Sequence, residues 1–351
     1  MKNERTKLQC MVPSCAWVAI ALLATACMDP VGSGMDPDAG PEPPRPDGGL
    51  YMPDAIIPPP DAGTDGGPGI AASAVKPNVM LLIDRSGSMA EPSDCGMATC
   101  PSKWQELLGL GAYLAEAKRM ARLGLAMFPS PVADGCSVTS SLRVPLSEAD
   151  DVDAQILAAT MSVIPGGRTP VADAMDAMGR VGGLDDPDRK NILLVLTDGR
   201  PNCSCATTDP VCERDAAVAA VQRLRGAAVP VDVDIIGFGS SARDADATLS
   251  AMAIAAGDDH YYQADTIEEL IGTLYEVAVR NVPCRFNLDE WPEPSQLIVW
   301  MDDVEVPVCT TDPCDEGYTY DAMTGVVEMQ GASCAALRDG EAHSVWFDTR
   351  S

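Results

Sequence analysis

Two apolar runs, each ending in an acidic residue, constrain the fold of this chain more than any other feature. Residues 78–83 (Asn-Val-Met-Leu-Leu-Ile) lead into Asp84, and residues 191–196 (Asn-Ile-Leu-Leu-Val-Leu) lead into Thr197 and Asp198. Continuous apolar runs of this length are typical of strands that are buried on both faces of a parallel sheet. Because ligands of open α/β sheets bind beyond the carboxyl ends of the strands, we expect both acids at a binding edge.

Strand and helix patterns alternate from residue 77 to about residue 282. Besides the two runs, strands are expected at 123–128, 136–144, 231–239 and 260–263, and helices at 102–122, 151–161, 170–178, 209–226, 242–256 and 267–280. Segment 136–144 is expected to pair with 123–128 as a hairpin. The alternation predicts an α/β fold in which a doubly wound, mostly parallel sheet carries helices on both faces.

Residues 283–351 have a different character. Helical periodicity fades there, and short β-like runs occur at 296–301, 318–320, 326–329 and 344–347. Three of the five tryptophans of the chain lie in this region: Trp291, Trp300 and Trp346. We expect a small β-rich extension that is stapled by disulfides.

The first 27 residues are predicted to be an export signal. A positively charged start is followed by an apolar stretch and then by small residues before Cys27. This segment resembles a bacterial lipoprotein signal, in which Cys27 would become the lipidated first residue. Ordinary cleavage near Ala26 and an uncleaved membrane anchor are the alternatives. All three place the rest of the chain outside the cytoplasm, either in the cell envelope as an outer-membrane or periplasmic lipoprotein, or secreted.

Residues 28–76 are dense in Pro, Gly and Asp and show no apolar periodicity. This composition is typical of a disordered, partly extended linker. It would act as a spacer between the anchor and the α/β domain at 77–282.

The cysteine count agrees with export to an oxidising compartment. Of 13 cysteines, 10 remain once Cys10, Cys15 and Cys27 are set aside, and this even number suits disulfide pairing. Six of them lie in the α/β region and four in the tail: Cys95, Cys100, Cys136, Cys203, Cys205, Cys212, Cys284, Cys309, Cys314 and Cys334. A zinc site is the less favoured alternative, because paired C-x-x-C spacings are missing and the chain has only two histidines.

Five oxygen-bearing residues form a motif around the two acids. Asp84, Ser86 and Ser88 alternate along the turn that leaves the first strand. Thr169 follows a Gly-Gly turn before a helix, and Asp198 follows the second buried strand. Two carboxylates and three hydroxyls make an all-oxygen site that suits a hard cation. The alternative is that these residues only form turns and cap helices, which are common uses of Ser, Thr and Asp.

Together these residues resemble the metal-ion-dependent adhesion site (MIDAS) of von Willebrand factor type A (vWA) domains. The resemblance covers about residues 77–281, including the segment 235–239 and the His-Tyr-Tyr stretch at 260–262. It implies a Rossmann-like fold and a Mg²⁺ ion, or alternatively Mn²⁺ or Ca²⁺. It also implies that three hydroxyls bind the metal and that two carboxylates bind it directly or through water: Ser86, Ser88, Thr169, Asp84 and Asp198.

The resemblance implies adhesion without catalysis. Neutral hydroxyls leave the cation able to attract a carboxylate from a protein or extracellular-matrix ligand. One alternative is a structural or assembly scaffold whose metal only stabilises loops. A metal-dependent hydrolase is less favoured, because no histidine or other plausible base is evident nearby.

The charge balance limits the other partners. Acids outnumber bases by 52 to 24, so no basic surface is large enough to hold a nucleic acid backbone. Membrane contact is expected only through the lipid anchor.

The six cysteines of the α/β region suggest a rigid rim around the metal. We expect them at the carboxyl edge of the sheet, with Cys95 and Cys100 in the loop after the first motif, Cys136 in a nearby turn, and Cys203, Cys205 and Cys212 in the loop after the second acid. Bridges there would rigidify a recognition surface and lower the ordering cost of binding. General stabilisation of an extracellular domain is the alternative.

Overall fold

The computed structural model describes residues 69–93, 99–131, 135–139, 141–207, 209–341 and 343–350. All of these belong to one of the two compact units of the chain, the one that covers Leu50–Ser351. The export signal with Cys27, most of the expected linker, and Cys95 lie outside the described residues. Among the residues that are described, no helix is long and apolar enough to cross a membrane.

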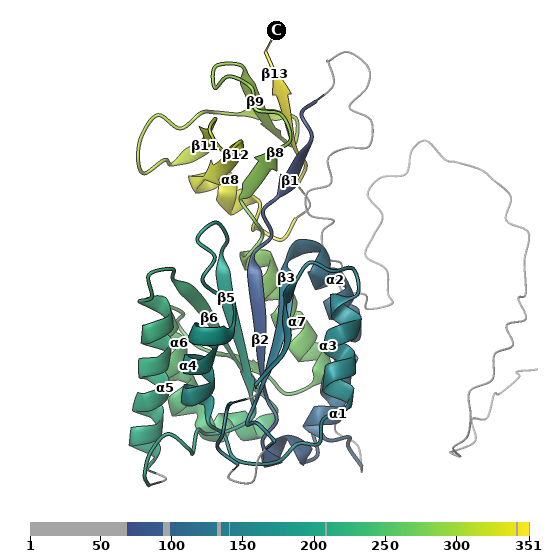
Figure 1. The fold of residues 1–351 in the computed structure, drawn as a ribbon, viewed down its shortest axis with the longest axis vertical. Helices are drawn as coiled ribbons and strands as arrows, with labels where there is room; N and C mark the ends of the chain where they lie inside the picture. Colours follow the sequence, from purple (N-terminus) through teal and green to yellow (C-terminus); the bar gives the residue numbers. More distant parts are fainter. Residues whose placement is uncertain are drawn as a thin grey trace, which may run out of the picture. The chain divides into compact units, whose positions relative to one another are not determined.

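The larger part of the described chain is built on a six-stranded sheet in the order β4-β3-β2-β5-β6-β7. Its strands are β2 (Asn78–Asp84), β3 (Arg122–Phe128), β4 (Leu142–Ser147), β5 (Asn191–Thr197), β6 (Val231–Phe238) and β7 (Tyr262–Ala264). β4 pairs antiparallel with β3, and all the other neighbours pair in parallel. Figure 1 shows helices on both sides of this sheet. The doubly wound, mostly parallel α/β sheet expected from the sequence is confirmed.

β2 and β5 lie in the middle of the sheet and are buried along their whole length. Because successive side chains of a strand point to opposite faces, Leu81 and Ile83 pack into one core while Met80 and Leu82 pack into the other. Each such side chain stabilises the fold by roughly 1.5–3 kcal/mol relative to an exposed position. Burial on both faces explains why these strands are unbroken apolar runs in the sequence.

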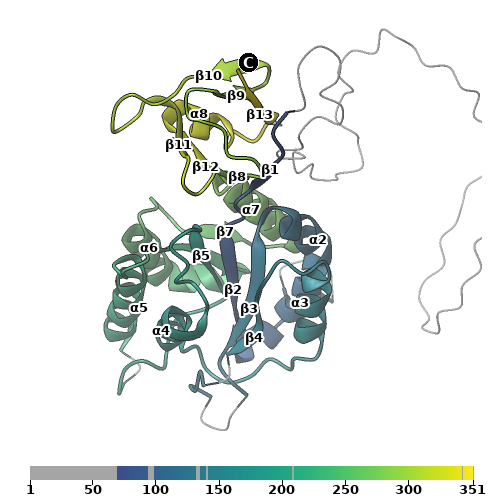
Figure 2. The same ribbon diagram turned by 45° about the horizontal axis from the view of Figure 1, so that its top comes forward.

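Two sets of helices cover the two faces of the sheet. The helices are α1 (Lys103–Leu107), α2 (Gly111–Met120), α3 (Val152–Met161), α4 (Val171–Val181), α5 (Pro210–Arg225), α6 (Asp246–Ala256) and α7 (Ile267–Arg280), with 3₁₀ turns η1 (Gly87–Ala90), η2 (Leu108–Leu110) and η3 (Ser240–Ala245). Helices α1, α2, α3 and α7 contribute to one core, and α4, α5 and α6 contribute to the other. Figure 2 shows α4 and α5 on one side of the sheet and α2 and α3 on the other.

Two local expectations differ from the structure. The strand expected at 136–144 begins only at Leu142, although its antiparallel pairing with β3 is as expected. The residues before it form a loop, because Cys136 is bridged to Cys203 and the amide of Ser130 donates to the carbonyl of Ser137. The helix expected at 102–122 is divided into α1 and α2 by the turn η2.

The tail consists of two small antiparallel sheets, ordered β1-β8-β12-β11 and β10-β9-β13. Its elements are β1 (Ala72–Ala74), β8 (Arg285–Leu288), β9 (Leu297–Met301), β10 (Val304–Val306), β11 (Glu316–Asp321), β12 (Val326–Gln330), α8 (Gly331–Ala336) and β13 (Val345–Thr349). They enclose a separate hydrophobic core that includes Phe286, Val299 and Phe347. Bridges Cys284–Cys334 and Cys309–Cys314 staple this region. The expected β-rich extension is confirmed, while β8, β10 and α8 had no clear signal in the sequence.

One strand of the tail comes from the other end of the chain. Ala72–Ala74, in the segment expected to be a linker, pairs antiparallel with β8. The next residue, Val75, donates its amide to the carbonyl of Arg285 at 2.8 Å, and β2 begins three residues later. Nη1 of Arg285 also donates to the carbonyl of Asp188, just before β5. The tail therefore joins the sheet at the amino-terminal ends of β2 and β5.

Candidate metal centre

The two central strands bring their terminal polar residues side by side. β2 and β5 pair in parallel up to Ile83 and Leu196, so the residues that follow lie next to each other. Oγ1 of Thr197 donates to Oδ2 of Asp84 at 2.6 Å. Asp84 and Asp198 are fully buried, and Thr197 is nearly so. The expectation that both acids meet at one edge of the sheet agrees with this arrangement.

The turn after β2 connects the two acids through hydroxyl groups. The amide of Ser86 donates to Oδ1 of Asp84 at 2.7 Å, which curls the turn back on the strand. Oγ of Ser86 lies 3.1 Å from Oγ of Ser88, which in turn donates to Oδ1 of Asp198 at 2.7 Å. Four of the five predicted ligands thus form one continuous hydrogen-bonded chain.

The loop of Thr169 is strapped to the same turn by backbone hydrogen bonds. The amide of Gly87 donates to the carbonyl of Gly167 at 3.1 Å, and the amide of Gly166 donates to the carbonyl of Arg85 at 2.8 Å. Gly167 has a φ of +94°, and a Cβ there would lie 2.7 Å from Cγ of Pro129, so only glycine suits this position. Thr169 is buried directly after this turn.

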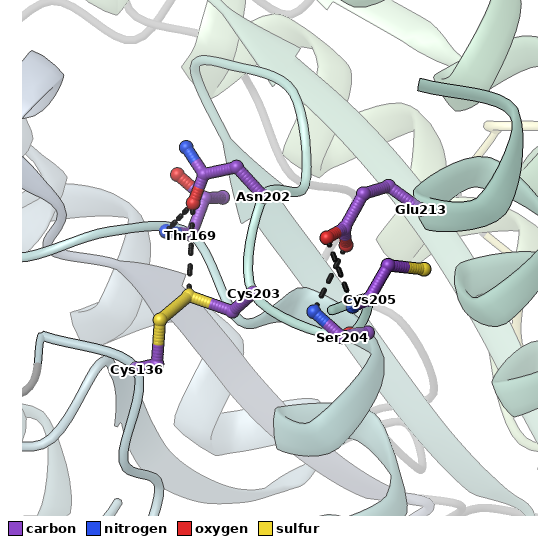
Figure 3. Close-up of a disulfide and its surroundings, with 7 residues drawn as sticks. All are labelled: Cys136, Thr169, Asn202, Cys203, Ser204, Cys205 and Glu213. Atoms are coloured by element: carbon purple, nitrogen blue, oxygen red, sulfur yellow. Dashed lines mark hydrogen bonds between the residues drawn. A yellow bond between two sulfur atoms is a disulfide. The ribbon is translucent and has the colours of Figure 1, made fainter. Parts of the chain in front are cut away.

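The loop after β5 completes the enclosure of Thr169. Oδ1 of Asn202 accepts from the amide of Thr169 at 2.8 Å, and the amide of Asn202 donates to the carbonyl of Thr169 at 3.2 Å. The neighbouring Cys203 is bridged to Cys136, as Figure 3 shows. Next to Cys136, the carbonyl of Gly135 accepts from the amide of residue 168 at 2.8 Å. One disulfide therefore ties together two loops that both contact the Thr169 loop.

A buried carboxylate holds the rest of this loop in place. Glu213 of α5 is 1 % exposed and accepts hydrogen bonds from the amides of Ser204 and Cys205, each at 3.0 Å (Figure 3). Cys205 is also bridged to Cys212 at the start of α5. Two of the bridges therefore lie in the loops that surround the candidate site. Cys100 is disulfide-bonded as well.

One cation lies inside the site and was not expected from the sequence. Nζ of Lys103, at the start of α1, lies 2.5 Å from Oδ2 of Asp198 and donates to Oγ of Ser241 at 2.7 Å. Ser241 in turn donates to the backbone carbonyl of Asp198 at 2.8 Å. Of the groups missed by sequence reasoning, Thr197 had a signal, since it precedes Asp198 directly. Lys103, Asn202, Glu213 and Ser241 had none, because only the fold brings them to this edge.

The electrostatics of the site favour a bound cation. Burial, and then the negative charge of Asp198, raise the pKa of Asp84 to about 7, while hydrogen bonds from Thr197 and Ser86 oppose this rise. Oδ2 of Asp198 is buried and already faces the ammonium group of Lys103. The remaining carboxylate oxygens and the hydroxyls form an all-oxygen set, so the five predicted residues could hold a hard cation such as Mg²⁺. The described residues contain no cluster of three or more His, Cys, Asp or Glu, so hydroxyls would supply much of the coordination.

The sheet order, its antiparallel β4 edge and the helices on both faces are those of a doubly wound, mostly parallel α/β fold. No protein-family model matches the chain, and no curated protein matches it. Solved structures match at low sequence identity, and three of them are described next.

The pilus adhesin SpaC of Lactobacillus rhamnosus GG is 13% identical, with 81% of this chain and 40% of that chain covered and a TM-score of 0.45. Proximal thread matrix protein 1 from the mussel byssus is 18% identical, with 60% of this chain and 48% of that chain covered and a TM-score of 0.41. A structure described as von Willebrand factor type A from Catenulispora acidiphila is 14% identical, with 78% and 57% covered and a TM-score of 0.40. The chain thus spans less than two thirds of the length of each of these structures.

Proposed function

We propose that this protein is a metal-dependent adhesion module that acts at the cell envelope. Asp84, Ser86, Ser88, Thr169 and Asp198 would bind Mg²⁺, or alternatively Mn²⁺ or Ca²⁺. A carboxylate of a protein or extracellular-matrix ligand would occupy the open metal position. The observation that carries this proposal is the hydrogen-bonded chain that joins Asp84, Ser86, Ser88 and Asp198 at one edge of the sheet.

The donor chemistry supports binding of an anionic ligand. Mg²⁺ prefers about six oxygens in an octahedron and usually keeps some positions for water or ligand. Two carboxylates supply its counter-charge, while the hydroxyls of Ser86, Ser88 and Thr169 are neutral. A cation held in this way keeps its attraction for a further carboxylate, which is the property that an adhesion site needs.

We propose no enzymatic activity for this protein, because neither histidine lies beside the candidate site. Both histidines of the chain have other surroundings. His343 lies in the tail, where its ring contacts Asp302 and Asp339, and His260 lies before β7 with its ring 6.2 Å from that of Tyr262. Among the described residues, no imidazole is positioned as a general base for a metal-bound water.

The location of the protein is part of the same proposal. The bridges Cys136–Cys203, Cys205–Cys212, Cys284–Cys334 and Cys309–Cys314 support an oxidising, extracytoplasmic compartment. We propose that Cys27 carries a lipid anchor and that the chain is held in the envelope by it, with secretion as the alternative.

The tail joins the sheet at the amino-terminal end of β2, whereas Asp84 ends that strand. Asn78 and Asp84, the first and last residues of β2, are therefore separated by about 20 Å.

A scaffold role is the second candidate, in which the metal only stabilises the loops. In that role, the backbone hydrogen bonds and the Cys136–Cys203 bridge that hold the loop of Thr169 would belong to a rigid frame for assembly. The two roles differ in what they require for ligand capture. Capture by an adhesion site is lost in EDTA, whereas capture by a scaffold persists.

Calorimetric titration of the exported chain with Mg²⁺ and Mn²⁺ tests the proposal. We expect saturable binding that the variant Asp84→Ala abolishes, because it removes a carboxylate from the proposed ligand set. Circular dichroism should show that the variant keeps the fold. The matched control is Asp232→Ala at the amino-terminal end of β6, where the carboxylate is half-exposed and pairs with Lys190. Undiminished metal binding by Asp84→Ala contradicts the site assignment.

A further inference from the structure

A lysine side chain is built into the wall of the proposed metal centre. Lys103 is only 3% exposed, and its Nζ lies 2.5 Å from Oδ2 of Asp198. A second contact fixes its position, because Nζ donates to Oγ of Ser241, which itself donates to the carbonyl of Asp198. Two groups therefore hold the ammonium group of Lys103: the carboxylate of Asp198 and the hydroxyl of Ser241. That hydroxyl is hydrogen-bonded to the backbone carbonyl of Asp198.

The fold makes specific room for this side chain. Gly239, between β6 and η3, has a φ of +80°, and a Cβ there would lie 2.8 Å from Cδ of Lys103. Lys103 also occupies the first position of α1, where the positive end of the helix dipole disfavours a cation. Burial of an ammonium group is costly unless it is paired. A lysine in this place therefore depends on Asp198 for its stability.

The lysine and the hydroxyls contact different oxygens of the same carboxylate. Oδ1 of Asp198 accepts from Ser88, which belongs to the proposed ligand set, whereas Oδ2 faces Lys103. The ammonium group therefore leaves in place the hydrogen-bonded chain of Asp84, Ser86 and Ser88. It contributes charge to the site and orients Asp198 without taking the position of the hydroxyl ligands.

We propose that Lys103 is a counter-cation built into the proposed metal centre, which keeps the site folded without metal and weakens its affinity for divalent cations. This inference rests on the metal site proposed above and concerns how that site is tuned. When both carboxylates and the ammonium group are charged, the metal-free site carries a net charge of about −1, compared with about −2 without the lysine. When a divalent cation is bound, the net charge of the site is about +1. With a neutral side chain in place of Lys103, the net charge of the metal-bound site would be near zero. The lysine thus preserves attraction for an anionic ligand at the cost of metal affinity.

The variant Lys103→Met tests this role, since it keeps much of the side-chain volume and removes the charge. The probes are Mn²⁺ and Mg²⁺ alone, measured by calorimetric titration, together with thermal unfolding in EDTA and in saturating Mg²⁺. We expect metal affinity to rise by about tenfold or more, because a positive charge next to a ligand is removed. We also expect a lower midpoint of unfolding in EDTA, and a larger rise of that midpoint on adding Mg²⁺ than in the wild-type chain.

Two controls separate charge from packing. Lys103→Arg retains the positive charge and should bind the metal with nearly wild-type affinity. Lys190→Met removes an ammonium group that pairs with Asp232 near the opposite ends of β5 and β6, and should leave metal affinity unchanged. The inference is overturned if Lys103→Met binds metal no more tightly than the wild-type chain, or if it loses the same stability with and without Mg²⁺.

Two further outcomes have defined meanings. If Lys103→Met unfolds in both buffers, the double variant Lys103→Met with Asp198→Asn decides, because it leaves no unpaired charge on either residue. Recovery of the folded state in EDTA supports the counter-cation role, and failure to recover it overturns the role. If neither the wild-type chain nor Lys103→Met binds metal in the folded state, the proposed metal site itself is wrong. The two failures are therefore distinguishable.

Discussion

Individual side chains at the edge that carries the proposed metal centre are buried, so their charges are only partly solvated. Asp84 keeps its hydrogen bonds from Thr197 and the amide of Ser86, yet burial and the neighbouring Asp198 still raise its pKa to about 7. Asp198 is balanced instead by Lys103. The two carboxylates of the proposed site are therefore unequal, because one is stabilised by hydrogen bonds and the other by an internal cation.

Glu213 gives a prediction at this scale. Replacing it with Gln should lower the free energy of unfolding by about 1–3 kcal/mol, because the amide group retains one acceptor oxygen and turns a donor toward a backbone N–H in a buried setting. Urea unfolding measures the change. The matched control is Glu276→Gln on α7, where the side chain is exposed and little change is expected. Equal stabilities of the two variants would contradict the role of Glu213 in holding Ser204 and Cys205.

At the scale of elements, the sequence predicted the strands and helices of the α/β region well. The continuous apolar runs were predicted to be buried strands, and they form β2 and β5. The helix expected at 267–280 is found with the same bounds. The start of β4 was predicted too early because the segment 136–139 has strand-like residues, while the bridge at Cys136 keeps it outside the sheet. A disulfide partner 67 residues away cannot be read from local pattern.

The loops at the carboxyl edge give a prediction of their own. Removing the Cys136–Cys203 bridge with the pair Cys136→Ser and Cys203→Ser should destabilise the chain by about 2–5 kcal/mol. Because the bridge adjoins Asn202, which holds Thr169, we also expect weaker Mn²⁺ binding and faster hydrogen exchange at the Thr169 amide.

The control for this prediction is the pair Cys309→Ser and Cys314→Ser in the tail. It removes a bridge of the β-rich extension and should leave Mn²⁺ affinity unchanged. If the rim bridge can be removed without any change in Mn²⁺ affinity or in exchange at Thr169, the bridge serves general stability only.

At the scale of the whole molecule, the tail and the metal edge are attached to opposite ends of the same central strand. β1, which pairs with β8 of the tail, directly precedes β2 in the chain, and Asp84 lies where β2 ends. The tail also has its own hydrophobic core and its own two bridges. Changes confined to the tail should therefore alter stability without altering the proposed metal centre.

The pH dependence of His343 tests this separation. Its hydrogen bond to Asp302, together with that to Asp339, raises the pKa of His343 in the folded state. Protonated His343 thus stabilises the fold below its unfolded pKa of about 6.5, and this contribution is lost as the pH rises through the higher folded pKa. We expect His343→Gln to be less stable than the wild-type chain at acidic pH, and the difference to shrink with rising pH. Chemical unfolding at a series of pH values measures it.

The same variant should bind Mn²⁺ with wild-type affinity, since its site is remote from the metal edge. A constant stability difference between His343→Gln and the wild-type chain at every pH would contradict the role of the His343–Asp302 bond. A changed Mn²⁺ affinity would contradict the separation of the tail from the metal centre.

The sequence by itself determined the buried strands, the alternation with helices and the five candidate ligands, because these depend on local pattern and on where strands end. Asp84 and Asp198 could be placed together since neighbouring parallel strands end at one edge. Only the tertiary structure decided what surrounds them. Lys103 lies 95 residues before Asp198 in the sequence, and no periodicity or spacing links the two. Their pairing arises because the fold brings the start of α1 to the end of β5, where a buried ammonium group must find a buried carboxylate.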